Sequence, residues 1–436
     1  MPLPKMLLVR QHFPDRQIHN VPDAVTQQMH SFPFADEFQP GARIAIGVGS
    51  RGIHNIPTIV RSVVDYWKGK GLEPFIFPAM GSHGGATDEG QKSVLATLGI
   101  TESTMACPIV SSMDIVPTGR TPDGIDTVMD RAAYESAGIF LINRVKWHTD
   151  FEDTIESGLF KMMTVGMGKL TGAKNYHRLG YEGRGLGEII RSAGRHILSS
   201  GKVLGGLAIL EDANNNTAHV ETLPAASMER REEELLVTVK GWKENIPLEL
   251  DVLIVNEIGK MVSGPGMDPK VVNRSSTTGA YNPWKNLPWI GRIYVRSLRP
   301  DSRGNAMGIG MADVIHDRVL QHIDERATGI NALTAQILSA VRVPMHHFST
   351  DRECLETIVR DMTFHKEWFD VRMGWIRNSM ELSLLGLSEN LEEQIRKNPQ
   401  LEIIGKAEAF AFDDNGQLVT RPFDLVSTAS RHMQPA

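Results

Sequence analysis

The feature that most constrains this chain is a repeated alternation of short apolar runs with segments of helical spacing. The run "GIFLINRV" (138–145) is apolar throughout instead of alternating, which predicts a strand buried on both faces of its sheet. Strands of this kind joined by helices predict a parallel sheet with ligand chemistry at the carboxyl ends of its strands. The other first-half segments are strands "RIAIGVG" (43–49) and "EPFIFPA" (73–79) and helices over 56–71 and 88–98.

The second half of the chain continues the alternation. It contains predicted strands at 202–212, 250–260 and 292–298, a charged, exposed helix at 227–242, and helices at about 310–323 and 330–341. A chain of 436 residues is too long for one ordinary core. We therefore predict an α/β protein of two domains with mainly parallel sheets and an active site in the cleft between them.

The predicted domains differ in their tasks. Residues 1–250 form an N-terminal catalytic and cofactor-binding domain, residues 251–425 form a C-terminal domain that closes over the substrate, and residues 426–436 form a disordered tail.

Composition narrows the class of protein. The formal charge of −6 gives no footprint for nucleic acid or an anionic membrane. No apolar run approaches the length of a membrane span, and the first residues lack the apolar region of a signal peptide. Two cysteines are too few for a disulfide framework. These features favour a cytoplasmic protein whose metal, if it has one, is held by His, Asp or Glu or by a cofactor, and they leave the oligomeric state open.

The first glycine-rich turn, "GVGSRG" (47–52), formally matches a dinucleotide-binding fingerprint. Two companions of that fingerprint are missing, because the next strand ends without a carboxylate and Pro57 delays the helix. The turn is therefore either a tight strand-to-helix connection or a means of presenting Arg51 to a carboxylate or phosphate.

Two histidines follow predicted strands at the same edge of the sheet. His83 lies in "FIFPAMGSHGGATDEG" (75–90) among glycines, on what we predict to be a flexible turn, and His148 lies in "NRVKWHTDF". A histidine that meets a ligand gains more from such a position than a structural one. Farther along, the small-residue stretch "SGLFKMMTVGMGKLTGAKNYHRLGY" (157–181) supplies further basic side chains: Lys161, Lys169, Lys174 and His177.

The order and spacing of these motifs resemble the nickel-dependent lactate racemase family of 2-hydroxyacid racemases and epimerases. Arg51 in "GSRG" resembles the early arginine of that family, and His83 in "GSHGGAT" and His148 resemble its two catalytic histidines. "SGLFK" resembles the family's Ser-Gly-Gly-x-Lys, with Leu159 in place of the second glycine, and so aligns Lys161 with a lysine linked to the cofactor. His177 falls where the family keeps a histidine that ligates nickel.

The resemblance implies a nickel-pincer nucleotide, a pyridinium mononucleotide with two sulfur arms, which is made by cofactor-biosynthesis enzymes. It also implies inversion of the C2 centre of a small 2-hydroxy acid, with His83 and His148 alternating as base and acid. Lys161 would tether the cofactor, His177 would bind nickel, and Arg51 would hold the substrate carboxylate or the cofactor phosphate. Glycines at 166, 168 and 172, together with Lys169 and Lys174, would let backbone amides approach a phosphate, or this loop is only a flexible connector.

The second half adds one candidate segment, "GPGMDPKVVNR" (264–274). Asp268, Lys270 and Arg274 would contact the substrate from the C-terminal domain, or they belong to an ordinary polar loop. Two other functions stay open. One is a metal-dependent hydrolase or lyase with His83, His148 and His177 as direct ligands, disfavoured because no clustered carboxylates accompany them. The other is a non-catalytic protein that binds the nickel-pincer cofactor.

Overall fold

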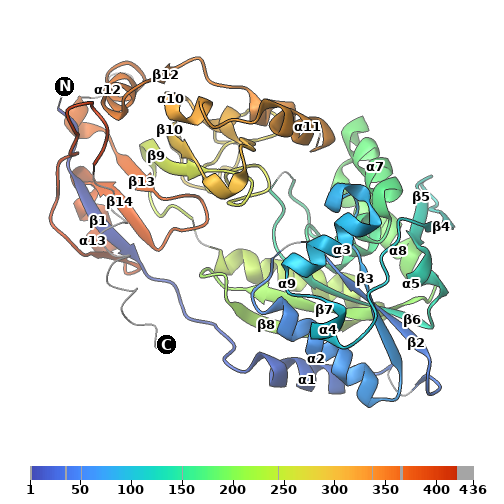
Figure 1. The fold of residues 1–436 in the computed structure, drawn as a ribbon. Coiled ribbons are helices and arrows are strands. Elements are labelled where there is room, and N and C mark those ends of the chain that lie inside the picture. The colour runs from blue at the N-terminus through green and yellow to red at the C-terminus, as the bar shows by residue number, and fades with distance from the viewer. Residues whose placement is uncertain are drawn as a thin grey trace. The chain divides into compact units, whose positions relative to one another are not determined.

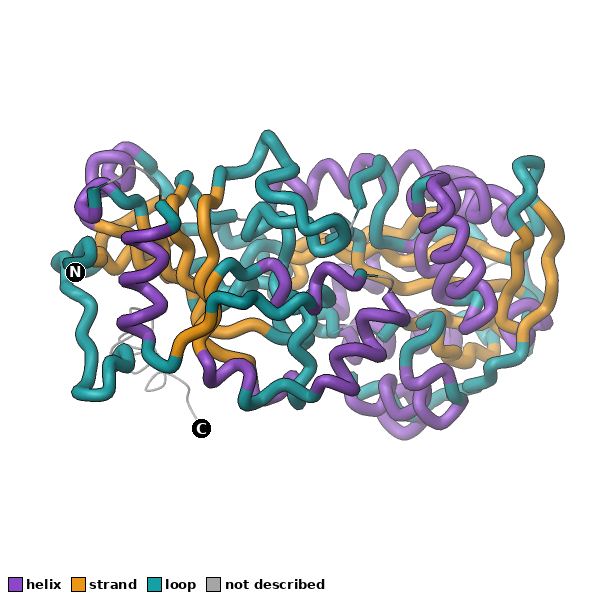
Figure 2. Tube along the Cα trace, turned by 90° about the horizontal axis from the view of Figure 1, so that it is seen from above, coloured by secondary structure: helices purple, strands orange, loops and turns teal. Residues whose placement is uncertain are grey.

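The structure is a computed structural model, and it describes residues 2–34, 37–50, 52–149, 151–243, 245–335, 337–363 and 367–419. The chain divides into two compact units. Asp15–Lys243 forms the N-terminal unit, and Met1–Pro14 with Glu244–Ala436 forms the C-terminal unit. Figure 1 shows both, and Figure 2 shows that each combines strands with flanking helices. None of the described helices is long and apolar enough to cross a membrane.

The N-terminal unit is built on a five-stranded sheet of order β3-β2-β6-β7-β8. The first four strands in this order are parallel, and β8 is antiparallel to β7. The chain passes from β2 outward to β3 and then returns to β6 on the opposite side of β2. The strand order therefore reverses between β2 and β6, which is where open α/β sheets bind ligands at their carboxyl edge.

The predicted strands of this sheet form close to their expected bounds. The five strands are β2 (Arg43–Val48), β3 (Glu73–Pro78), β6 (Gly138–Arg144), β7 (Val203–Glu211) and β8 (Thr217–Pro224), and a separate hairpin joins β4 (Ile115–Arg120) to β5 (Asp126–Asp130). The α-helices are α1 (Val21–His30), α2 (Ile56–Gly69), α3 (Asp88–Thr97), α4 (Glu102–Met105), α5 (Arg131–Glu135), α6 (Leu159–Lys161), α7 (Lys169–Leu179), α8 (Leu186–Leu198) and α9 (Met228–Trp242). Among the described residues, the unit also contains two π-helices, η3 (Met162–Gly166) and η4 (Gly180–Arg184), and the 3₁₀ turns η2 (Gly84–Ala86) and η5 (Ala225–Ser227).

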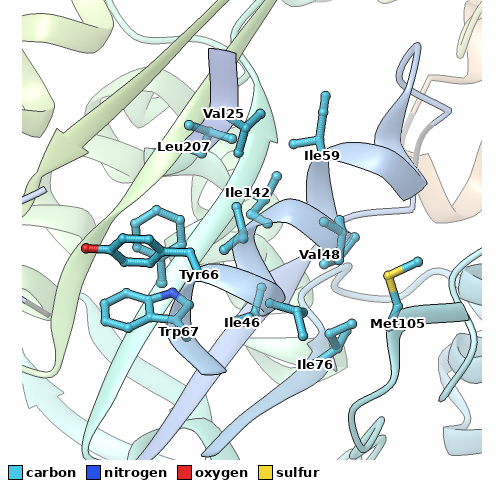
Figure 3. Packing of buried hydrophobic residues seen from close by; sticks show 14 of the residues in the cluster. Val25, Ile46, Val48, Ile59, Tyr66, Trp67, Ile76, Met105, Ile142 and Leu207 are labelled. Atoms are coloured by element: carbon cyan, nitrogen blue, oxygen red, sulfur yellow. The ribbon is translucent and has the colours of Figure 1, made fainter. Parts of the chain in front are cut away.

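Apolar side chains cover both faces of this sheet, as the unbroken apolar runs predict. On one face, Ile46 and Val48 of β2 pack with Ile59 and Trp67 of α2 (Figure 3). The opposite face packs against α8 and α9 in a second cluster. Burial on both faces leaves the strand ends and the turns that follow them as the places where polar chemistry can sit.

The C-terminal unit is built on an eight-stranded sheet of order β12-β11-β10-β9-β13-β14-β1-β15. The strands from β12 to β13 are parallel, and β14, β1 and β15 pair antiparallel. They are β1 (Met6–Gln11), β9 (Leu250–Ile258), β10 (Ile290–Leu298), β11 (Val314–His316), β12 (His347–Phe348), β13 (Met373–Ile376), β14 (Leu384–Ser388) and β15 (Leu401–Ile403). The α-helices are α10 (Asp317–Leu320), α11 (Glu325–Ala335), α12 (Asp351–Asp361) and α13 (Glu392–Lys397), and 3₁₀ turns lie at η6 (Pro300–Ser302), η7 (Ile309–Met311), η8 (Leu338–Val341), η9 (Trp368–Asp370) and η10 (Glu389–Leu391).

The observed organisation departs from the predicted one in three respects. The first 14 residues belong to the C-terminal unit, because β1 pairs with β14 and β15. The prediction of one helix over 310–323 is wrong, because the strand β11 and the short helix α10 occupy this stretch. The helix predicted at 330–341 begins earlier, as α11, and its last part is η8. The tail predicted at 426–436 lies outside the described residues.

Candidate functional site

The carboxyl ends of β2, β3 and β6 bring three turns to one edge of the N-terminal sheet. The amide of Ala79, just after β3, donates to the carbonyl of Val48 at the end of β2 over 2.9 Å. A side chain at Gly49, just after β2, would meet Met162 at 3.1 Å and Asn143 of β6 at 3.7 Å. We call this edge the rim: the turns after β2, β3 and β6 together with the segment 157–168.

His83 lies at the start of η2, in the turn between β3 and α3. Its ring Nδ1 lies 2.7 Å from the carbonyl oxygen of Met80. A carbonyl oxygen can only accept, so Nδ1 carries a proton and a neutral His83 has its basic lone pair on Nε2. The exposed side chain is therefore held in one tautomer by its own turn.

The glycines of this turn permit close packing, which differs from the flexible turn that the sequence predicts. Gly84 has φ +64°, and a Cβ there would lie 2.5 Å from the carbonyl carbon of Gly90 in α3. Gly81 has φ +59°, and a Cβ there would lie 3.1 Å from the carbonyl oxygen of Val165 in η3. These positions require glycine because the backbones of adjacent segments touch.

His148 lies in the segment that leaves β6. Lys146 and Ser157 form an isolated antiparallel bridge, so the residues between them make a closed excursion from the rim. The amide of His148 donates to the carboxylate of Glu156, a fully buried side chain that also pairs with Lys240. The His148 ring stacks on Phe151 at a centroid distance of 4.4 Å. Backbone and ring are thus both held at a half-buried site.

Lys161 lies at the end of α6, close to the same aromatic ring. Its ammonium lies 5.9 Å from the centroid of Phe151, within the range of a cation–π interaction. At the start of α6, the amides of Leu159 and Phe160 donate to the buried carboxyl group of Glu232 in α9 at 2.9 and 3.1 Å. Phe151 therefore links Lys161 to His148.

The segment that carries Lys161 is bonded to the strand β6 and to the turn after β3. The side-chain amide of Asn143 in β6 donates to the carbonyl of Gly158 over 2.8 Å. The amide of Gly81, in the turn that holds His83, donates to the carbonyl of Gly166 over 3.0 Å. Between these contacts the chain forms the π-helix η3, a conformation often found at functional sites. The structure therefore brings His83, His148 and Lys161 to one rim.

Three basic residues of α7 have different surroundings. Lys174 and His177 are exposed, and their spacing of three residues places them on one face of the helix. Lys169 is fully buried, where its ammonium lies 3.0 Å from a carboxylate oxygen of Asp130 and 2.7 Å from the carbonyl of Pro78. Lys169 therefore contacts the protein interior and not the surface at which a phosphate would bind.

The remaining predicted residues lie elsewhere. Arg51 lies outside the described residues. Asp268, Lys270 and Arg274 belong to the C-terminal unit, where Lys270 lies over the Trp284 ring at 6.0 Å. Arg274 is buried and donates to the carbonyls of Ile290 and Gly291 at 2.8 Å each. Its guanidinium supports the local backbone, so we do not include Arg274 among the proposed ligand contacts.

The histidines do not form a metal site by themselves. Within the described part of the chain, no three His, Cys, Asp or Glu side chains are grouped so that they could hold a metal ion. His83, His148 and His177 are all described residues, and the hydrolase or lyase alternative requires them as joint ligands. This arrangement does not favour that alternative.

Sequence reasoning missed two buried polar residues that support the rim, Gln91 and Glu232. A periodicity signal was present for both. Gln91 is one helical turn before the buried Leu95 of α3, and Glu232 falls in the buried stripe of α9 with Met228 and Leu235. The prediction that α9 is simply an exposed charged helix is wrong for this face. A polar residue inside an apolar stripe is a usable sign of a buried support.

The fold and the rim define an α/β protein with a histidine- and lysine-bearing edge at a strand-order reversal. No protein-family model and no curated protein matches the chain. Among solved structures, it is similar to the lactate racemase apoprotein from Thermoanaerobacterium thermosaccharolyticum, with 12% identity, a TM-score of 0.46, and coverage of 78% of this chain and 87% of that one. It is also similar to a structural-genomics protein from Thermotoga maritima, with 12% identity, a TM-score of 0.47, and coverage of 74% and 82%.

Proposed function

We propose that this protein is an isomerase that inverts the C2 centre of a 2-hydroxy acid with a nickel-pincer nucleotide as cofactor. One observation carries the proposal: the segment bearing Lys161 is bonded to the turn of His83 and to β6, and Lys161 shares the ring of Phe151 with His148. The motif resemblance in the sequence gives these residues their proposed roles.

The protein's own part in the reaction is proton transfer. Inversion at a hydroxyl-bearing carbon requires a base for the hydroxyl proton whichever enantiomer is bound, and two imidazoles can serve the two enantiomers in turn. The contact between Nδ1 of His83 and the Met80 carbonyl supports Nε2 as the atom that would take and return the proton. His148, with its ring stacked on Phe151, is the proposed second base.

The residues of the rim suit the proposed cofactor. When bound, a nickel-pincer nucleotide supplies a hydride acceptor and donor for C2. It brings sulfur ligands of its own, so the protein would need to add only one nitrogen ligand. Lys161 is the proposed tether, and His177 the proposed nickel ligand, with Lys174 one turn away on the same exposed face. Asp268 and Lys270 remain proposed substrate contacts.

The test is to produce the protein together with enzymes that make the cofactor. Intact-mass measurement should show an added cofactor mass that is lost in Lys161→Ala, and a panel of single-enantiomer 2-hydroxy acids should lose optical purity. His83→Gln and His148→Gln should lower turnover by roughly 10²–10⁴-fold while the cofactor mass stays. A cofactor adduct without racemisation of any acid would instead indicate a cofactor-binding protein. Full turnover by either histidine variant would refute the assigned roles.

A further inference from the structure

A buried polar cluster lies directly beneath the His83 turn. Its members are Lys169 at the start of α7, Asp130 at the end of β5 and Gln91 of α3, and all three side chains are fully buried. Removing an ammonium and a carboxylate from water is unfavourable for each ion before their mutual attraction is counted. The contacts of these three side chains indicate which part of the structure the cluster stabilises.

Three of the cluster's hydrogen bonds end on main-chain carbonyls between the end of β3 and His83. Lys169 donates to the carbonyl of Pro78 at 2.7 Å, the last residue of β3, and to the side-chain oxygen of Gln91 at 3.3 Å. Gln91 then donates to the carbonyl of Gly81 at 2.8 Å and to that of His83 at 3.3 Å. Three main-chain carbonyls between the end of β3 and His83 are therefore held by two buried side chains.

The backbone at Lys169 shows that its placement is enforced. Its φ of +53° lies in the left-handed region, which is uncommon and strained for a residue with a side chain. The ion pair with Asp130 at 3.0 Å offsets the burial of the charge. Burial lowers the pKa of the Lys169 ammonium, and the Asp130 carboxylate opposes this shift.

We propose that Lys169 is a positioning residue for His83: through Pro78 and Gln91 it fixes the turn that sets the tautomer and direction of the His83 ring, and it joins that turn to the helix that follows the Lys161 segment. This replaces the phosphate-binding role that the sequence predicts for Lys169. The inference rests on the proposed acid–base role of His83 only for its catalytic consequence, because the geometry of the turn can be measured without any reaction.

The test compares three substitutions in the full-length protein. Lys169→Met removes the ammonium and keeps an unbranched side chain. Gln91→Glu keeps an acceptor for Lys169 but removes the donor to Gly81 and His83. Lys92→Met is the control: it makes the same chemical change next to Gln91, but at an exposed ammonium that pairs with Glu102.

The primary measurement is long-range proton–nitrogen NMR on histidine-labelled protein at pH 8, with the His83 signals identified by their loss in His83→Gln. We expect the Nδ1–H tautomer in the unmodified protein and in Lys92→Met, and a mixture of tautomers in Lys169→Met and Gln91→Glu. Amide exchange across 79–84 should rise by about tenfold or more in the same two variants. If Lys169→Met does not fold, Gln91→Glu decides the matter. A folded variant of either kind with unchanged tautomer and exchange overturns the proposal.

A second measurement separates this inference from the proposed function. On cofactor-loaded protein, Lys169→Met should lower kcat by about tenfold or more with little change in KM, because the ring is misdirected while substrate contacts remain. If the unmodified protein racemises no 2-hydroxy acid, the proposed function fails, and the NMR result still decides the role of Lys169. An active Lys169→Met enzyme with an unchanged kcat overturns the catalytic part of the inference.

Discussion

Each unit contains a buried ion pair, and the two pairs hold different things. In the C-terminal unit, Asp351 accepts from Arg296 at 2.8 and 2.9 Å, from Tyr294 at 2.6 Å and from Arg318 at 2.9 Å. It also accepts the amide of Leu418 at 3.0 Å, which joins the last described residues to the start of α12. In the N-terminal unit, Lys169 pairs with Asp130 and donates to the main-chain carbonyl of Pro78, in the segment that leads to His83.

The cations differ as much as the contacts. Arg296 of β10 donates two hydrogen bonds from its guanidinium to the carboxylate of Asp351 at the start of α12. A guanidinium stays charged inside a protein, whereas a buried ammonium can lose its proton. The Asp351 centre is therefore a permanent clamp between parts of the fold. The ion pair of Lys169 and Asp130 lies next to the His83 turn, and its ammonium can change its charge. Matched substitutions in the two ion pairs can test this difference.

The largest effect should come from Asp351→Asn. The substitution keeps the shape of the side chain but leaves Arg296 charged and without its carboxylate, and breaking a buried pair in this way costs about 3–5 kcal/mol. Calorimetric unfolding should show the loss, and hydrogen exchange should assign it to the C-terminal unit, with the segment near Leu418 released first.

Raising the pH should not rescue this variant, because arginine does not titrate in the accessible range. The His83 tautomer should be unchanged. If Asp351→Asn has the stability of the unmodified protein, Asp351 is not a clamp and the contrast between the two pairs disappears.

The matched change in the other pair, Asp130→Asn, should have a smaller effect of about 1–3 kcal/mol at neutral pH. Asparagine can still accept the amide of Ala133, to which Asp130 now bonds at 2.9 Å, so the helix cap survives. Lys169 loses its counter-charge, and its already lowered pKa should fall further.

The sign of the pH effect follows from that shift. The folded variant binds fewer protons than the unfolded chain below the ordinary lysine pKa, so its stability should recover as the pH rises and fall as the pH drops. Unfolding measured by denaturant at several pH values checks this. A deficit that is the same at every pH would mean that Lys169 stays charged, as Arg296 does.

The parallel strands of the N-terminal sheet and the turns that follow them could be predicted from the sequence, because both depend on short runs of adjacent residues. The run at 138–145 has no polar face, so it can only be a strand buried on both sides, and His148 must then follow a carboxyl end. The delayed start of α2 at Ile56 likewise follows from Asn55 and Pro57. Such features depend on a few adjacent residues.

Long-range partners could not be predicted in the same way. The residues near Met6–Gln11 do not show that β1 pairs with strands almost 400 residues later. The partner of such a strand depends on the packing of the complete sheet and not on the strand's own sequence. Lys169 illustrates the same limit at the site: its neighbours in sequence suggest a phosphate loop, but its contacts with Asp130 and Pro78 come from distant segments. Only the periodicity of α3 and α9 could have pointed to Gln91 and Glu232.

A third buried carboxyl group extends the comparison, because no ion pair to Glu232 is found among the described residues. Glu232 accepts two amides at the start of α6, and its other oxygen is buried without a hydrogen-bond partner. Burial raises the pKa of Glu232 to about 8, and the two amide donors oppose the shift. Unlike Asp351, whose pKa its donors lower, this side chain is therefore expected to hold a proton in the folded protein at neutral pH.

The smallest predicted effect is the pH dependence that this proton creates. Between the ordinary glutamate pKa and about 8, the folded protein holds a proton that the unfolded chain releases, so stability is greatest at the acidic end and falls as the pH rises. The slope is on the order of 1.4 kcal/mol for each pH unit in that window. Glu232→Gln should flatten it, whatever its absolute stability. Glu234→Gln, an exposed change on the same helix, should keep the slope between pH 5 and 8, because its carboxyl pKa is lowered and it is ionised in both states across that range. Urea unfolding at half-unit steps of pH measures all three proteins. An unchanged slope in Glu232→Gln would show that the slope does not come from Glu232. Glu232 would then be ionised where it accepts the amides at the start of α6.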